Sequence, residues 1–386
     1  MVRNIYLLAF FAALTNQLVG IVAVRELSEY DFAIYTVFNS ALLFGLPIIT
    51  FGIQRVIRIR SNYEIDLGNR MISDALFKSM KASLLTLPLI GILMYFSFDL
   101  RIVDVVILLF SIVFLGLQSI LLVKYELNAM WSKRQFILFL GGLLIFLSVL
   151  VLSASSYASV SRLIGVSCFA VIFLVLNASY FYAEREKILF KDIVLIGLPL
   201  ALISVGDNFL FLIDKKILLT NANSSEVALY GAYLIIFNLV SLSYKPMAPI
   251  IEKLIIKKKV SIRHVCYFLV LVFIGVFFVW LLSENIFEYV YDYRYNLSTN
   301  ILLKVYILAV VKVVRDIMRT AISTQGKLYG SLIFSVAGLV IYMLSNPSNA
   351  FQGIDSILLC YCIMLVGDGA LALKVMGKSL FIANKN

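Results

Sequence analysis

The feature that most constrains this chain is a repeated apolar run of about 20 residues, the length that a helix needs to cross the hydrocarbon core of a bilayer. Soluble domains are about 45–50% apolar and about 25% charged, whereas this chain of 386 residues is 62% hydrophobic and 14% charged. An outer-membrane barrel would show alternating strands of about ten residues instead. The sequence therefore predicts an all-α integral membrane protein and excludes a soluble enzyme.

The apolar runs predict twelve transmembrane helices. The segments are 5–24, 32–53, 80–98, 102–123, 136–153, 160–182, 192–213, 227–249, 265–283, 300–320, 326–344 and 355–375. The first segment is too long for a signal peptide and lacks a small-x-small cleavage site before Arg25, so we expect it to remain as a span.

The distribution of Lys and Arg predicts the orientation. If the N-terminus is cytoplasmic, most of the 33 Lys and Arg fall in inner segments. The outer loops would hold only Arg25, Arg101, Lys215, Lys216 and Arg294. We therefore expect both termini in the cytoplasm. Basic inner loops facing an anionic leaflet account for most of the net charge of +11, so no nucleic-acid partner is expected.

An internal repeat divides the chain into halves. A shift of 195 residues places Asp31–Tyr35 over Glu226–Tyr230, and both segments read acidic, apolar, Ala, apolar, Tyr. The same shift superposes the first six predicted helices on the last six, as in transporters built from parallel repeats. The prediction is therefore two six-helix lobes, at residues 1–183 and 192–386, joined by a cytoplasmic linker at 184–191.

Motifs for enzyme chemistry are absent from the sequence. The one His and the four Cys are not spaced as metal ligands, and the glycine-rich phosphate loop of ATP-driven pumps is missing. We expect no catalytic residue, no metal and no cofactor.

Ionisable residues inside spans are the candidates for function, because each costs several kcal/mol at the bilayer centre unless it faces a cavity or a partner. The predicted helix 300–320 holds the densest set. At about 100° per residue its four cations share a face about 80° wide that extends over about 22 Å of depth. These are Lys304, Lys312, Arg315 and Arg319. We predict that they line a water-filled cavity that attracts anionic substrates.

A second interpretation of this face needs no cavity. Lys304 would reach the outer surface, Arg315 and Arg319 the inner one, and Lys312 would pair with Asp316. Carboxylates form another candidate set for ion coupling or for the cavity: Asp207, Asp214 and Asp368. Asp207 lies deepest in its span and is predicted to pair with a cation or to bind a coupling proton or sodium ion.

Three short motifs resemble those of a known family. Arg25–Tyr35 resembles the opening of bacterial polysaccharide exporters, in which the first helix ends in Arg-x-Leu and an acidic turn leads to an aliphatic-Tyr helix start. Gly197–Leu200, Asp214-Lys215 and Ala228–Tyr230 resemble the Gly-x-Pro, Asp-(Lys/Arg) and (Gly/Ala)-x-Tyr motifs of the same group. The chain thus resembles O-antigen and polysaccharide flippases of the Wzx type, in the multidrug/oligosaccharidyl-lipid/polysaccharide exporter superfamily.

This resemblance implies two six-helix lobes around a central cleft and a place in the bacterial inner membrane. It also implies a function in lipopolysaccharide or other polysaccharide biosynthesis. Such a flippase translocates an undecaprenyl-pyrophosphate-linked oligosaccharide from the cytoplasmic to the periplasmic leaflet by alternating access. The implied partners are that polyprenyl-pyrophosphate-linked oligosaccharide, the lipid bilayer, a polysaccharide polymerase and a chain-length regulator. The cations of the helix 300–320 suit a pyrophosphate.

Two alternatives remain open. A cation-coupled multidrug exporter of the related branch would use acids such as Asp207 and Asp368 for cationic substrates. A glycosyltransferase or polymerase with many spans would need a large polar loop, and the longest predicted loop, 54–79, lacks a carboxylate pair arranged for catalysis.

Overall fold

The structure, a computed structural model, describes residues 2–61, 64–221, 223–241, 298–324, 328–347 and 349–383, together with scattered positions between 270 and 281. The helix predicted at 265–283 and the second part of the one at 227–249 lie largely outside these residues. The chain divides into two compact units, unit 1 (Met1–Gly231) and unit 2 (Ala232–Asn386). This division is separate from the predicted sequence repeat, whose boundaries stay a prediction.

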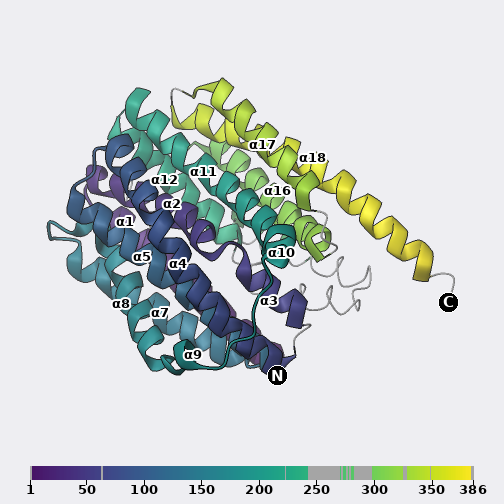
Figure 1. Ribbon diagram of the computed structural model, residues 1–386. Coiled ribbons are helices and arrows are strands. Elements are labelled where there is room, and N and C mark those ends of the chain that lie inside the picture. Colours follow the sequence, from purple (N-terminus) through teal and green to yellow (C-terminus); the bar gives the residue numbers. More distant parts are fainter. Residues whose placement is uncertain are drawn as a thin grey trace. The chain divides into compact units, whose positions relative to one another are not determined.

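Unit 1 is a bundle of long helices (Figure 1). Its elements are α1 (Val2–Glu26), α2 (Glu29–Thr50), α3 (Ile53–Ser61), α4 (Ile65–Phe98), α5 (Ile102–Leu121), α6 (Val123–Leu127), α7 (Trp131–Leu152), η1 (Ala158–Val160), α8 (Ser161–Leu176), α9 (Ser179–Tyr182), α10 (Phe190–Asp192), η2 (Ile193–Gly197) and α11 (Leu198–Asn221). Helix α1 packs on α7, α7 on α8, α8 on α5, and α5 on both α2 and α4. Helix α11 packs on α2.

Unit 2 contains three described long helices. They are α16 (Thr299–Thr324), α17 (Leu328–Ser345) and α18 (Ala350–Ala383). Helix α18 packs along both α16 and α17. Helix α12 (Ser224–Ser241) begins in unit 1 and continues in unit 2.

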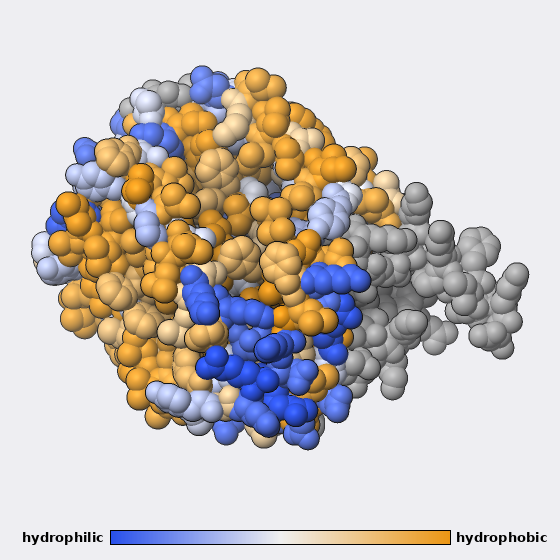
Figure 2. Space-filling model, viewed as in Figure 1, coloured by the Kyte–Doolittle hydropathy of each residue, from blue (hydrophilic) through white to orange (hydrophobic). Residues whose placement is uncertain are grey.

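The long helices have the character of membrane spans. Seven of those in the described part of the chain are long and apolar enough to cross a bilayer. Large apolar side chains of α4 face outward, with Leu84 74% and Phe96 78% exposed. Figure 2 shows apolar side chains over much of the visible face of unit 1 and hydrophilic ones gathered around α3. Such apolar surface is costly in water and suited to lipid, so the predicted class, a multi-pass helical membrane protein, is confirmed.

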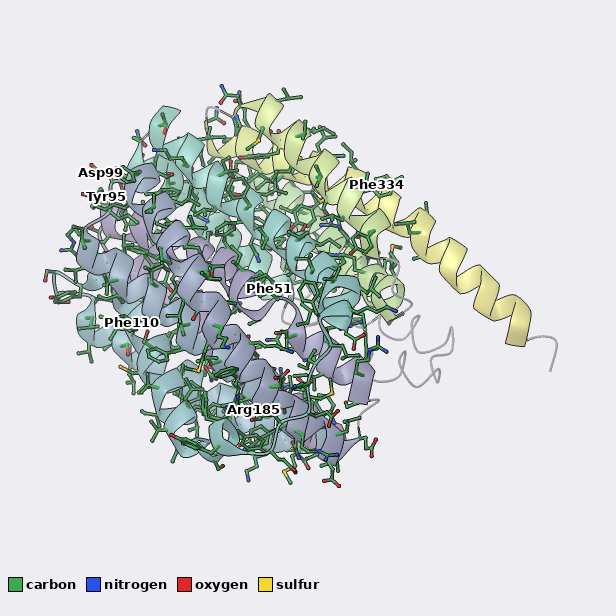
Figure 3. All side chains as sticks on the ribbon, in the orientation of Figure 1. Phe51, Tyr95, Asp99, Phe110, Arg185 and Phe334 are labelled. Carbon is green, nitrogen blue, oxygen red and sulfur yellow. The ribbon has the colours of Figure 1, made fainter. Side chains whose placement is uncertain are left out.

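Local sequence signals set the helix ends. Ser28 caps α2 by accepting a hydrogen bond from the Asp31 N–H at 3.1 Å. Helix α2 stops at Phe51, whose φ of 45° is left-handed, and α4 stops in the same way at Asp99, with φ of 49°. The N–H of Asp99 donates to the carbonyl of Tyr95 at 3.1 Å (Figure 3).

A close backbone approach explains Gly197 of the Gly-x-Pro motif. A Cβ at Gly197 would lie 2.4 Å from the carbonyl oxygen of Phe51, and one at Gly52 would lie 2.5 Å from that of Gly197. Gly52 also has φ of 63°. The π-helical turn η2 precedes Pro199, which cannot donate a backbone hydrogen bond. Only glycine lets the end of α2 contact η2 so closely.

Two predicted loops are helical in the structure, and this corrects the sequence analysis. Of the loop predicted at 54–79, the residues up to Ser61 belong to α3 and those from Ile65 onwards to α4. Helix α11 continues to Asn221, so Lys215 and Lys216 lie in a helix and not in an outer loop. Both errors arise because polar residues end an apolar run without ending the helix, whose hydrogen bonds continue regardless of side-chain polarity.

Of the linker predicted at 184–191, residues 184–189 have no regular secondary structure and run along α4, and residues 190–191 belong to α10. The Ile188 N–H donates to the carboxylate of Asp74 at 2.9 Å, and the Lys78 ammonium donates to the Ile188 carbonyl at 2.5 Å. The guanidinium of Arg185, labelled in Figure 3, lies 4.4 Å from the centre of the Phe77 ring. These contacts fix the linker to unit 1.

Candidate functional site

The four predicted cations of α16 all lie among described residues of unit 2. The deepest is Arg315, whose side chain is fully buried between α16, α17 and α18. Its Nε donates to the Asp368 carboxylate at 2.9 Å, and Asp368 is also fully buried. A second nitrogen donates to the Ser335 hydroxyl at 2.7 Å, and the guanidinium lies 5.4 Å from the centre of the Tyr361 ring. Arg315 is thus a buried, paired cation and does not reach the membrane surface.

Lys312 and Arg319 share one carboxylate. The Lys312 ammonium lies 3.3 Å from Asp316, one turn further on, and Arg319 donates to the other carboxylate oxygen at 3.0 Å. The side chains of Lys312 and Asp316 are 27% and 28% exposed. We call Lys312, Asp316 and Arg319 the α16 triad. It joins two cations to one anion and therefore carries one net positive charge in a partly accessible position.

Lys304 lies towards the N-terminal end of α16. Its ammonium is 2.7 Å from the carboxylate of Asp355 on α18, which is 50% exposed. The pairing of Lys312 with Asp316 agrees with the second interpretation of this helix face, whereas the burial of Arg315 does not. Substrate binding by the four cations stays a prediction.

The predicted carboxylates of unit 1 lie on α11 and are buried. Asp207 is 5% and Asp214 0% exposed. The adjacent amide of Asn208 donates to the carbonyl of Leu43 on α2 at 2.9 Å. Ion coupling by Asp207, Asp214 and Asp368 stays a prediction.

Lys215 is a buried cation, whereas the sequence analysis predicted that it lies in an outer loop. It is 1% exposed, and its ammonium donates to the Ser40 hydroxyl of α2 at 2.5 Å and to the Phe211 carbonyl at 3.2 Å. The ring centre of Tyr230 lies 5.6 Å away. Lys215 follows Asn208 by seven residues on α11, which is two helical turns. This spacing indicated that both side chains lie on the face of α11 that contacts α2.

A second charge cluster was also missed. Glu126 is 1% exposed, its carboxylate accepts a hydrogen bond from Arg58 at 2.7 Å, and it forms an ion pair with Arg134 at 2.9 Å. The three residues come from α3, α6 and α7. Long-range pairs of this kind leave no spacing signal in the sequence. Among the described residues, no group of three His, Cys, Asp or Glu side chains comes together as a metal site.

Comparison with known proteins identifies the fold. No protein-family model matches the sequence, and neither does any curated protein. Solved structures do match over nearly the whole chain. A MATE transporter in complex with Br-NRF has a TM-score of 0.65 at 13% identity, covering 99% of this chain and 95% of that one. A multidrug resistance MATE family transporter of the MOP superfamily, in an outward-facing conformation, has a TM-score of 0.66 at 11% identity, covering 96% and 94%.

A third similar structure is a MOP superfamily transporter from Pyrococcus furiosus. Its TM-score is 0.64 at 12% identity, covering 97% of this chain and 95% of that one. It is described as having a binding pocket of reverse polarity that suggests a different function. This chain therefore has the fold of the MATE transporters of the MOP superfamily.

Proposed function

We propose that this protein is a flippase for polyprenyl-pyrophosphate-linked oligosaccharides in the bacterial inner membrane. The lipid-linked repeat unit of an O-antigen or similar polysaccharide moves from the cytoplasmic to the periplasmic leaflet by alternating access of a cleft between the two lobes. Both termini are cytoplasmic in this proposal. A polysaccharide polymerase and a chain-length regulator then use the exported unit.

The observation that carries the proposal is the α16 triad. Lys312 and Arg319 both contact Asp316, and the cations of α16 outnumber the carboxylates that they contact by one, so the group attracts an anion. In a low-dielectric environment such attraction is much stronger than in water. The guanidinium of Arg319 also offers the planar donor pair that suits phosphate oxygens. A pyrophosphate crossing a bilayer needs cations of this kind at depth.

The fold alone does not decide between substrates. Transporters of this fold include multidrug exporters, and a MOP superfamily member with reversed pocket polarity is also known. The charge of the site is therefore a better guide to the substrate than the fold is. For α16 and its carboxylate partners on α18, the described side chains comprise four cations and three anions.

A cation-coupled multidrug exporter is the second candidate. It is favoured by the buried carboxylates of α11, Asp207 and Asp214, which suit cationic substrates or a coupling ion. The two candidates differ in the sign of charge that each expects on the substrate.

The test is export in a strain that lacks the gene and carries each variant at matched membrane abundance. We expect deletion to stop assembly of surface polysaccharide without changing sensitivity to cationic dyes. Lys312→Ala should abolish export, whereas Lys191→Ala, which removes an exposed cation of α10, should not. Loss of dye resistance with normal polymer length would favour the multidrug exporter.

A double variant separates substrate binding from a structural ion pair. Lys312→Met together with Asp316→Asn removes the charges of both partners of this ion pair, and the amide oxygen of the Asn can still accept from Arg319. We expect this variant to insert and to export nothing. Full export would show that Lys312 does not contact the substrate.

A further inference from the structure

A cation of unit 1 has an unusual partner. The guanidinium of Arg162, in the first turn of α8, donates to the phenolic oxygen of Tyr35 on α2 at 3.3 Å. Arg162 is half-buried, and its Nε is buried without a hydrogen-bond partner in the part of the chain that the structure describes. By contrast, the guanidinium groups of Arg58 and Arg315 each donate to a carboxylate. A buried donor left without an acceptor destabilises the folded protein, and more so when the donor is charged.

Two carboxylates at this end of unit 1, Asp31 and Asp104, bind other groups. Asp31, one turn before Tyr35 on α2, accepts the Ser28 hydroxyl at 2.6 Å. Asp104 accepts two nitrogens of Arg101 at 2.8 and 3.0 Å, and these contacts raise the pKa of Arg101 above its ordinary value. The described residues therefore supply a carboxylate to Arg101 and none to Arg162.

The surroundings of Arg162 favour an anion. Tyr35 is 4% exposed, so its hydroxyl is held in place by packing and can donate its own proton. Asn39 lies one turn further along the same face of α2, and its buried Oδ1 has no partner among the described residues. An amide in this position can present its nitrogen to an acceptor. The positive end of the α8 dipole adds to the field of the guanidinium.

We propose that Arg162, Tyr35 and Asn39 form an oxyanion-binding site in unit 1. The planar fork of Arg162 and the hydroxyl of Tyr35 suit two oxygens of a phosphate or carboxylate group. If the proposed function holds, the oxyanion is the pyrophosphate or an acidic sugar of the lipid-linked oligosaccharide. The site lies in the first turns of the span Ala158–Leu176, at its predicted periplasmic end, where such a group leaves the membrane interior.

The test measures binding to the purified full-length protein in a maltoside detergent, which has neither phosphate nor carboxylate groups. Inorganic pyrophosphate and glucuronate are titrated separately at constant ionic strength, and binding is followed by the shift in melting temperature. We expect a saturable shift with at least one of them. The more effective probe identifies the source of the oxyanion, phosphate or sugar carboxylate.

Variants assign the binding to this site. Arg162→Gln should weaken the apparent affinity by about tenfold or more, since it removes a charged donor pair. Arg162→Lys and Tyr35→Phe should each weaken it by a smaller factor, and these two decide the question if Arg162→Gln does not fold. Arg101→Gln is the matched control, because it removes a neighbouring arginine with its own carboxylate, and it should bind as the native protein does.

Two results would overturn the site: no saturable shift with either probe, or an unchanged affinity in the Arg162 and Tyr35 variants. Both are independent of polymer export, because the experiment uses purified protein and small anions. Failure of the proposed function would instead appear as normal surface polysaccharide in the deletion strain.

Discussion

Breaking the buried pair between Arg315 and Asp368 should cost more stability than breaking any exposed pair of unit 2. The substitution Asp368→Asn keeps the size of the side chain and removes its charge. Both partners are fully buried, so the guanidinium is left in a low-dielectric environment without its counter-charge. Loss of one partner of a buried pair typically costs about 3–5 kcal/mol.

Neighbouring groups place the expected cost near the lower limit of that range. The Ser335 hydroxyl, at 2.7 Å, and the Tyr361 ring, at 5.4 Å, remain in contact with Arg315 after the substitution. We therefore expect a loss of about 3 kcal/mol, which is about a hundredfold in the folding equilibrium, since each 1.4 kcal/mol corresponds to about a factor of ten.

The assay is reversible unfolding of the purified protein in mixed detergent micelles, followed by circular dichroism. Asp355→Asn is the matched control, because Asp355 is half exposed in its pair with Lys304, and such pairs contribute about 0–1 kcal/mol. The double variant Arg315→Met with Asp368→Leu should recover most of the lost stability. If Asp368→Asn is as stable as Asp355→Asn, the buried pair does not contribute as argued.

Three further expectations follow from unit 1. Glu126→Gln should lower the free energy of unfolding by about 3 kcal/mol or more, because Arg58 and Arg134 both lose their carboxylate; an unchanged denaturation midpoint would contradict this. Gly197→Ala should cost about 1–3 kcal/mol in the same assay, since its Cβ would meet a backbone oxygen that cannot turn away, whereas Gly206→Ala, with open space around it, should cost little. Alkaline phosphatase fusions near residues 99 and 156 should be active and those near 130 and 188 inactive; the opposite pattern would reverse the predicted orientation.

The fold class could be predicted from the sequence because membrane helices are set by length and hydrophobicity. All helices predicted within the described residues are present, including the charged α16. The predicted ends of the helices were less accurate. Helix α4 begins at Ile65, 15 residues before the predicted start at 80, because polar residues can continue a helix beyond the bilayer. No change in apolar content marks such an extension.

Within the candidate site, the sequence predicted only the contact between residues of one helix. The pairing of Lys312 with Asp316 follows from their spacing of four residues on one helix. The pairing of Arg315 with Asp368 joins residues 53 positions apart and depends on how α18 packs on α16. The burial of Lys215 against Ser40 likewise depends on the packing of α11 on α2. Helical periodicity gives the face of a residue but not the neighbour that covers it.

Translocation by the purified protein in liposomes tests the proposed function most directly. The lipid-linked oligosaccharide is placed in the inner leaflet, and its arrival in the outer leaflet is measured with a lectin that cannot cross the bilayer, alongside accumulation of a cationic dye. The proposal expects lectin binding to rise with the native protein and with Lys191→Ala, to stay at the level of empty liposomes with Lys312→Ala, and no dye to accumulate. Dye accumulation without movement of the oligosaccharide would contradict it.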